Sequence, residues 1–242
     1  MTTLGFLYPG HSAEDDYPRI EQLLGSDVRL ELVHTDVGED APEGLAKGVE
    51  QLRLAGAEAV VWICAREGFA QGGEGARQQV RALAMTAGTP ASATPFAFVH
   101  AAREIGAARV AVGVAGPDEA AGRFAELLRA GGLEVVGSAG AGEHPDPAAA
   151  GEAGGGGGAG GAGEADVLAL ARAADDPRAE AVLLPDPALH TAAHLPALEE
   201  ALGKPVLTAS QVAVWEALRL AGRRVNAPGL GALFAQEPIV QM

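Results

Sequence analysis

Short apolar runs alternate with longer amphipathic stretches along most of this chain. The apolar runs are expected as strands: Leu4–Tyr8, Val28–His34, Ala59–Ile63, Pro90–Ala93, Arg109–Val114, Leu133–Val136, Ala181–Leu184 and Val206–Ala209. Helices are expected between and after them: Glu14–Leu24, Leu45–Ala55, Gln78–Ala87, Phe96–Ile105, Glu119–Ala130, Val167–Ala174, Leu195–Leu202 and Val212–Ala221. Apolar strands separated by helices are typical of a parallel sheet that is covered on both faces. We therefore predict an α/β fold.

The two halves of this pattern repeat each other. Ala57–Ala65 aligns with Ala179–Pro187, with four identical residues at the start and apolar runs of equal length. Gly88-Thr89-Pro90 and Gly203-Lys204-Pro205 then precede the next strand and helix in each half. A duplication predicts two pseudo-symmetric lobes, each a short parallel sheet flanked by helices, with the site between the lobes. We assign residues 1–100 plus 213–242 to lobe 1 and 101–212 to lobe 2.

A glycine-rich segment, Gly151–Gly163, fits neither half. Glycine loses so much backbone entropy on ordering that such a run does not hold a helix or pack a core. A phosphate-binding loop would need a preceding strand, a following helix and, in a P-loop, a lysine, which this run lacks. We therefore expect a flexible surface insertion in lobe 2.

Composition narrows the possible partners and location. The 242-residue chain carries 17 basic and 32 acidic residues, a formal net charge of −15, which disfavours binding to nucleic acid or to anionic membrane surfaces. Hydrophobic residues make up 48% and aromatics only 4%, which suits helices packed on a parallel sheet. With one cysteine, and no signal peptide or transmembrane helix visible in the sequence, we expect a cytoplasmic protein.

The duplication also selects the candidate catalytic residues. Cys64 and Asp186 follow equivalent strands, and ligands of open α/β sheets bind beyond the carboxyl ends of the strands. If the lobes face each other, a thiol and a carboxylate flank one cleft, which suits acid–base or nucleophilic chemistry. The alternative is that Cys64 is an ordinary buried thiol of the core.

Several motifs resemble one protein family. They are Gly5–Pro9, Val60–Cys64 with Gly68-Phe69, Leu198–Val206, Ser210-Gln211 and Trp215–Gly222. Together they resemble the maleate isomerase and arylmalonate decarboxylase branch of the Asp/Glu racemase superfamily, over nearly the whole chain except the glycine-rich segment. The resemblance implies two lobes, no cofactor, and one reactive residue from each lobe, often a pair of cysteines.

The chain departs from that family pattern at several positions. The first cysteine is kept as Cys64, but Asp186 stands at the position of the second, which is the one that the decarboxylases retain. Ala65 and Arg66 replace polar residues that bind the substrate carboxylate in the family, and Ser12 replaces an asparagine. Gly116 stands where many relatives have a tyrosine that contacts the substrate. These changes predict a divergent enzyme or one that has lost activity.

Other polar groups near the predicted cleft are candidates for substrate binding. Arg66 is able to pair bidentately with a carboxylate, and the loop residues His11 and His190 add polarisable groups, although all three also fit a solvated surface. Our substrate-binding candidates are His11, Ser12, Ala65, Arg66, Pro187 and His190. The acids of Glu14-Asp15-Asp16 are interpreted as favouring a helix dipole rather than as a metal site.

We expect a cofactor-independent isomerase, racemase or decarboxylase for a small carboxylic acid. Cys64 would act as nucleophile or base, and Asp186 as the opposing acid or base. The alternative is an inactive relative that binds a small carboxylate or has a regulatory role. A two-lobed solute-binding protein is a third class, which the lack of a signal peptide argues against. A homo-oligomer is expected.

Overall fold

The computed structural model describes residues 1–10, 13–35, 42–64, 72–140 and 163–235. The first half contains β1 (Thr2–Pro9), α1 (Asp16–Leu24), β2 (Val28–Thr35), α2 (Pro42–Leu54), β3 (Ala59–Trp62), α3 (Gly72–Ala87), β4 (Ala91–Ala93) and α4 (Thr94–Glu104). The second half contains β5 (Arg109–Val114), α5 (Asp118–Ala130), β6 (Glu134–Gly140), α6 (Glu164–Ala174), β7 (Ala181–Leu184), α7 (Leu195–Leu202), β8 (Val206–Thr208) and α8 (Ala209–Leu220). Two short 3₁₀ turns follow, η3 (Pro228–Leu230) and η4 (Ala232–Phe234).

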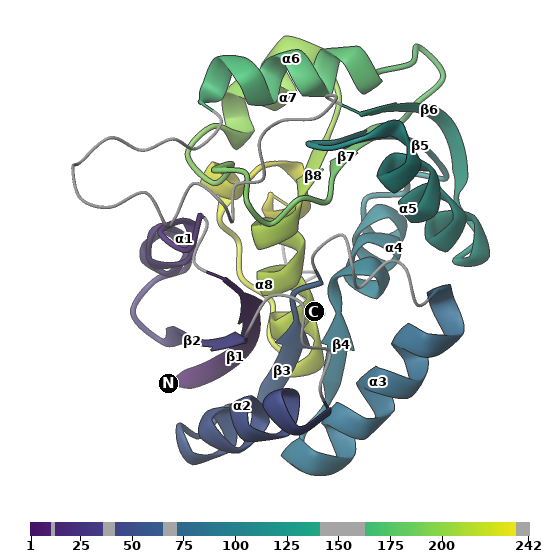
Figure 1. The fold of residues 1–242 in the computed structure, drawn as a ribbon. Coiled ribbons are helices and arrows are strands. Elements are labelled where there is room, and N and C mark those ends of the chain that lie inside the picture. The colour runs from purple at the N-terminus through teal and green to yellow at the C-terminus, as the bar shows by residue number, and fades with distance from the viewer. Residues whose placement is uncertain (11–12, 36–41, 65–71, 141–162, 236–242) are drawn as a thin grey trace, which may run out of the picture.

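The strands form two four-stranded parallel sheets of identical topology. Their orders are β2-β1-β3-β4 and β6-β5-β7-β8, so corresponding strands occupy corresponding places. Figure 1 shows the first sheet below and the second above, each flanked by helices. Every predicted strand and helix is present, and the predicted α/β fold of two pseudo-symmetric lobes is confirmed.

Equivalent hydrogen bonds mark the duplicated segments. The amide of Val60 donates to the carbonyl of Pro90, and that of Val182 donates to Pro205, both at 3.0 Å. Gly88 and Gly203 end α3 and α7 with φ values of +67° and +65°, a left-handed conformation that glycine adopts without strain. The sequence match between the two Gly-x-Pro segments therefore reflects the same turn made twice.

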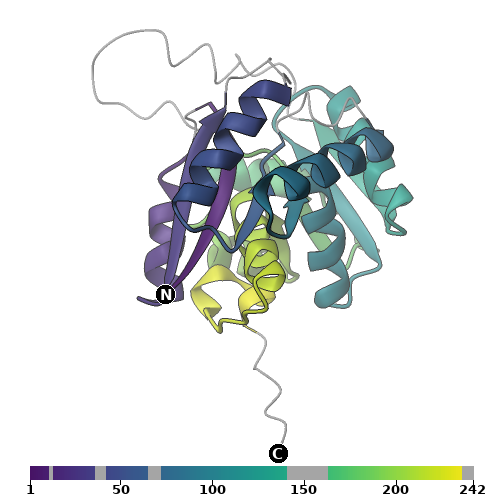
Figure 2. The same ribbon diagram turned by 90° about the horizontal axis from the view of Figure 1, so that it is seen from below.

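Helices α4 and α8 exchange places between the lobes. Helix α8 follows the second sheet but packs on β1, β3 and β4 of the first, on the same face as α1. Helix α4 follows the first sheet but packs against α5 and β8, and the two exchanged helices also contact each other. Seen from below, α2 and α3 cover the opposite face of the first sheet (Figure 2). The predicted lobe boundaries fall inside α4 and α8 and stay a prediction.

The largest hydrophobic core is continuous across both lobes because of this exchange. It includes Phe6 of β1, Phe98 of α4, Phe124 of α5 and Val212 of α8. The rings of Phe98 and Phe124 pack edge to face with centroids 5.4 Å apart, which joins α4 to the second lobe. A smaller core lies under α6 and α7. The shared core fixes how the strand ends of one lobe face those of the other.

Several predicted elements were too short, and the differences are largest for α3 and β6. Helix α3 begins at Gly72 rather than Gln78, since its packing on α2 offsets the low helix propensity of its glycines. Strand β6 runs to Gly140 rather than Val136, because pairing with β5 continues to Val114. Most of the glycine-rich segment, residues 151–162, lies outside the described residues.

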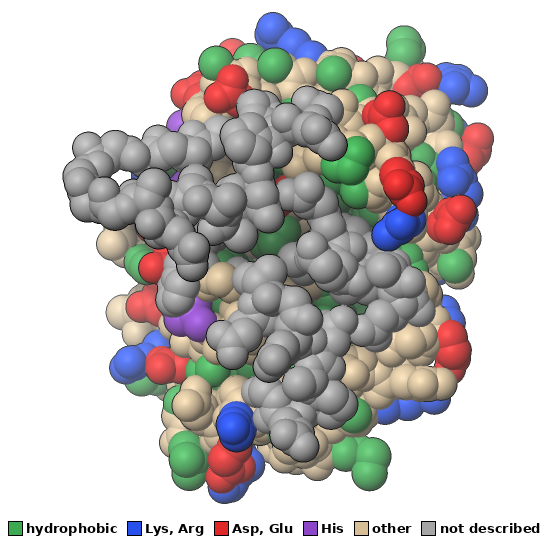
Figure 3. Space-filling view, viewed as in Figure 1, with side chains coloured by type: hydrophobic (Ala, Val, Ile, Leu, Met, Phe, Trp, Pro, Cys, Tyr) green, Lys and Arg blue, Asp and Glu red, His purple; other side chains and the backbone are tan. Residues whose placement is uncertain are grey.

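No helix among the described residues is both long and apolar enough to cross a membrane. On the face shown in Figure 3, acidic and basic side chains are interspersed along the perimeter.

Candidate active site

Cys64 and Asp186 occupy equivalent places in the two lobes. Each lies two residues beyond its strand, Cys64 after β3 and Asp186 after β7. Both strands lie between the first strand of their own half and an outer strand, and both point their carboxyl ends out of a parallel sheet. The predicted placement of both residues at matching strand ends agrees with this geometry.

The backbone at Cys64 is held by the first residue of α4. The amide of Cys64 donates to the hydroxyl of Thr94 at 3.2 Å, and that hydroxyl donates to the carbonyl of Trp62, also at 3.2 Å. Both Cys64 and Thr94 are completely buried, and the thiol lies 3.9 Å from the Trp62 carbonyl. Cys64 therefore has a fixed position at the strand end.

Asp186 begins a tight turn and is 6% exposed. One carboxylate oxygen, Oδ1, accepts a 2.9 Å hydrogen bond from the amide of Ala188, two residues further along the chain. Such a bond to residue i+2 is a local turn that aspartate stabilises well. The loop from Asp186 to Ala192, which we call the Asp186 loop, leads from this turn toward α7.

Tyr8, at the end of β1, reaches across to the other lobe. Its hydroxyl donates a 2.8 Å hydrogen bond to the carbonyl of Pro187. Burial raises the pKa of Tyr8, and the negative charges of Asp16 and Asp186 raise it further, so the hydroxyl stays protonated and donates at neutral pH. Since β1 pairs with β3, this bond brings the Asp186 loop to the sheet edge where Cys64 lies.

Asp16, the first residue of α1, contacts the other half of the chain through four hydrogen bonds. Its Oδ2 atom accepts hydrogen bonds from the amides of Thr191 at 2.9 Å and Ala192 at 3.1 Å, and from the hydroxyls of Thr191 at 3.3 Å and Ser210 at 3.0 Å. Asp16 is only 4% exposed. Hydrogen bonds to a charged group contribute roughly 1.5–3 kcal/mol each, and together they offset the cost of burying the carboxylate.

Acids and histidines pair at the rim of this region. The Nδ1 atom of His190 lies 3.0 Å from Oδ1 of Asp15, and the Nε2 atom of His34 lies 3.2 Å from Oε2 of Glu14. His34 Nδ1 also lies 2.7 Å from the carbonyl of Gly10. Both histidines are thus engaged by carboxylates of lobe 1.

The sequence-predicted residues divide into two groups. Cys64, Asp186, Pro187 and His190 are described, and Asp186, Pro187 and His190 share one loop that is tied to lobe 1. The other four, His11, Ser12, Ala65 and Arg66, lie outside the described residues. The assigned roles of all eight stay predictions. Within the described ranges, no group of three or more His, Cys, Asp or Glu residues is arranged to hold a metal ion.

Tyr8 and Asp16 belong to this region but are not among the site residues predicted from the sequence. Asp16 does lie in the first turn of α1, as a helix-dipole acid would, but its carboxylate is used by the other lobe. Its partner Thr191 is 175 residues away, so no local spacing could identify the pair. Tyr8 does lie near the end of a central strand and within the Gly5–Pro9 motif, and these two signals were available in the sequence.

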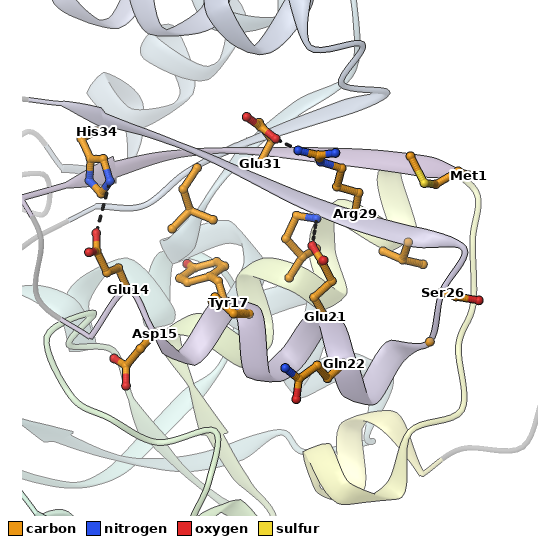
Figure 4. Close-up of a pocket in the computed structure, with 15 residues that line it drawn as sticks. Met1, Glu14, Asp15, Tyr17, Glu21, Gln22, Ser26, Arg29, Glu31 and His34 are labelled. Carbon is orange, nitrogen blue, oxygen red and sulfur yellow. Dashed lines mark hydrogen bonds and ion pairs between the residues drawn. The ribbon is translucent and has the colours of Figure 1, made fainter.

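A groove between α1 and β2 adjoins this rim, because Glu14, Asp15 and His34 also line it. It encloses about 990 Å³ and is lined by both apolar and acidic side chains, among them Tyr17, Glu21 and Glu31 (Figure 4). Glu21 accepts a 2.6 Å hydrogen bond from the amide of Leu30 on this outer strand. Its lining includes neither Cys64 nor Asp186. We therefore place the candidate active site at the strand ends between the lobes rather than in this groove.

Comparison with known proteins shows the family of this chain. A family model described as arylmalonate decarboxylase matches residues 14–142 and 162–234. The chain belongs to the arylmalonate decarboxylase family. A solved arylmalonate decarboxylase is 25% identical, with a TM-score of 0.79 over 97% of this chain and 100% of that one. A comparison with curated protein sequences gives no significant match.

Two maleate isomerases share the fold. The enzyme from Pseudomonas putida is 17% identical with a TM-score of 0.79, over 97% of this chain and 98% of that chain. The maleate cis-trans isomerase from Nocardia farcinica, bound to Tris, is 20% identical with a TM-score of 0.80 over the same shares. The family match supports an enzyme of the arylmalonate decarboxylase type, and the two maleate isomerases show a shared fold.

Proposed function

We propose that this member of the arylmalonate decarboxylase family isomerises, racemises or decarboxylates a small mono- or dicarboxylic acid without a cofactor. Cys64 acts from lobe 1 as nucleophile or base, and Asp186 acts from lobe 2 as the opposing acid or base. The observation that carries the proposal is the equivalent placement of the two residues beyond β3 and β7, with Tyr8 tying the Asp186 loop to the edge where Cys64 lies.

Maleate is the first substrate to test. The Cys64 thiolate adds to one alkene carbon, forming a C–S bond, while the π electrons pass to the neighbouring carbon and its carboxylate. The central bond is then single and rotates, and expulsion of the thiolate restores the alkene as fumarate. Asp186 protonates the carbanion and removes the same proton before expulsion, so the overall reaction neither gains nor loses atoms.

The relatives offer chemical precedent for this route. A structure of the Pseudomonas putida enzyme contains maleate, and a variant of the Nocardia farcinica enzyme contains a covalently bound succinylcysteine intermediate. The kept cysteine at position 64 favours the same covalent route here. Arg66, two residues further along the chain, is our candidate for pairing with a substrate carboxylate.

Substituted malonates are the second substrate class. Loss of carbon dioxide from an arylmalonate leaves its electron pair on the α-carbon, and either the Cys64 thiol or a protonated Asp186 supplies the proton that completes the arylacetic acid. Racemisation would use the same pair, with one residue removing the α-proton and the other returning it on the opposite face.

The decisive experiment follows turnover of maleate, phenylmalonate and a chiral 2-arylpropionate by NMR and chiral chromatography. Wild-type protein is compared with Cys64→Ala and Asp186→Asn. We expect turnover of at least one substrate and its loss in Cys64→Ala. Turnover that survives unchanged in Cys64→Ala would exclude the mechanism.

A carboxylate-binding protein without turnover is the second candidate. It is favoured by Asp186 at the position where the family pattern has its second cysteine. Iodoacetamide labelling separates the two functions. A reactive thiol labels in the native state and is protected by maleate, whereas a core thiol labels only after unfolding and is indifferent to maleate.

A further inference from the structure

We propose that Asp16 is a positioning residue that clamps the Asp186 loop to lobe 1 and so sets Asp186 opposite Cys64. The inference rests on the proposed function for its catalytic part, whereas the clamp itself is a property of the fold.

The clamp holds the Asp186 loop near both ends. Tyr8 holds the start of the loop, because its hydroxyl donates a hydrogen bond to the carbonyl of Pro187, the residue after Asp186. Asp16 holds the far end through the amides of Thr191 and Ala192. Both anchors come from lobe 1, while the loop belongs to lobe 2. The position of Asp186 is therefore set by the lobe that carries Cys64.

Asp16 also joins the loop to the exchanged helix. Ser210, in the first turn of α8, donates to the same Oδ2 atom that the Asp186 loop uses, and its hydroxyl lies 3.4 Å from that of Thr191. Helix α8 packs on the sheet that carries Cys64. One carboxylate oxygen thus gathers α1, α8 and the Asp186 loop at a single buried point.

The burial of this contact explains why an acid is required. Two backbone amides and two hydroxyls converge on one oxygen, and a buried donor without an acceptor is costly. A carboxylate oxygen accepts several such bonds, while the amide of asparagine offers one neutral oxygen and adds two further donors. Asp16→Asn therefore keeps the side-chain size but weakens the clamp.

The duplication supplies a matched control. Asp118 is the first residue of α5, the counterpart of α1 in lobe 2, and its Oδ1 accepts a 2.9 Å hydrogen bond from the amide of Gly140. This bond stays within lobe 2. Asp118→Asn removes the same charge at the same helix position without touching the contact between the lobes.

Hydrogen exchange followed by mass spectrometry tests the clamp. In Asp16→Asn we expect faster exchange in peptides covering 186–194, whereas Asp118→Asn changes exchange at the end of β6 and leaves 186–194 as in the wild type. Unchanged exchange of 186–194 in Asp16→Asn, and in Asp16→Ala as a stronger variant, overturns the proposal.

Kinetics test the positioning role with the substrate that the wild type turns over. We expect kcat of Asp16→Asn to fall on the order of tenfold to a hundredfold with KM nearly unchanged, since a misplaced reacting group slows the reaction more than it weakens binding. Asp118→Asn should keep both constants even if it melts earlier.

The outcomes separate the clamp from the proposed function. Faster hydrogen exchange of 186–194 in Asp16→Asn with unchanged kcat means that Asp16 clamps the Asp186 loop for stability only, and the positioning role is wrong. If the wild-type protein turns over none of the three substrates, the proposed function and the positioning role are wrong. If Asp16→Asn still speeds exchange of 186–194 in that case, the clamp between the lobes stands.

Discussion

The phenolic hydroxyl of Tyr8 donates a hydrogen bond of 2.8 Å to the carbonyl oxygen of Pro187. Tyr8 is the next-to-last residue of β1, which lies beside β3 in lobe 1, and Pro187 directly follows Asp186 in lobe 2. The contact spans 179 positions of the chain, and it joins the end of β1, the neighbour of the strand that Cys64 follows, to the loop that carries Asp186.

Tyr8→Phe should loosen this junction. We expect a loss of about 1 kcal/mol in the free energy of unfolding, typical of one hydrogen bond, together with reduced kcat. Tyr17→Phe is the matched control, because among the described residues the buried Tyr17 hydroxyl has no hydrogen-bond partner and its ring packs edge-on against Tyr8. Denaturant titration measures the free energy of unfolding of both variants. Equal losses of this free energy in Tyr8→Phe and Tyr17→Phe would contradict the assigned role of Tyr8.

Cys64→Ala should reduce turnover by roughly a thousandfold or more, as expected when a nucleophile is removed. The side chain is fully buried, but alanine removes only its sulfur atom, so the melting temperature should fall only modestly. Turnover is followed by NMR and melting by calorimetry. A large loss of stability with normal turnover of the remaining folded protein would make Cys64 a core thiol.

Asp186→Asn should lower kcat on the order of a hundredfold while substrate still binds, because the amide keeps the shape but does not exchange a proton. The hydrogen bond from Ala188 to Oδ1 remains possible with the asparagine oxygen. Steady-state kinetics with the active substrate measure the split between kcat and KM. A raised KM at constant kcat would assign Asp186 to binding instead.

Stability should fall in acid because of Glu216, which is completely buried on α8. Burial raises the pKa of this carboxyl, but hydrogen bonds from Arg219, His100 and Ser92 and the charge of His100 outweigh it and lower the pKa from 4.5 to about 2. A group with a lowered folded-state pKa stabilises the protein above its unfolded pKa, and the contribution disappears as the pH falls from about 4.5 to about 2. It amounts to about 3 kcal/mol, at roughly 1.4 kcal/mol per pH unit.

Glu216→Gln should therefore be less stable at neutral pH and show a flatter loss of stability between pH 5 and 2. Glu119→Gln, which removes an exposed partner of Arg123, serves as the control and should follow the wild type. Urea denaturation across this pH range measures both variants. Parallel curves for Glu216→Gln and wild type would show that Glu216 does not carry the acid sensitivity.

Replacing residues 151–162 with a short Gly-Ser linker should leave the melting temperature and activity nearly unchanged. Loop closure depends weakly on length, at roughly 0.6 kcal/mol per doubling. Gly163 is kept because its amide donates to Asp166 at the start of α6. Calorimetry would reveal a large drop in melting temperature if the segment were part of the folded core.

Much of the fold follows from the local pattern. Strands such as β5 (Arg109–Val114) and β7 (Ala181–Leu184) have the predicted bounds. A short apolar run is buried as a strand, and the strand ends where the apolar run ends. The duplication placed Cys64 and Asp186 at equivalent positions, since repeated sequence folds into repeated turns. The family resemblance is confirmed by the matching family model.

Tertiary packing decided the contacts that cross between the lobes. The sequence did not distinguish Asp16 from its exposed neighbour Asp15, yet Asp16 bonds Thr191 and Ser210 while Asp15 lies at the rim beside His190. Periodicity reports whether a position is buried or exposed, because that depends on its own element. The partner of a buried polar side chain depends on which distant segments the exchange of α4 and α8 brings together.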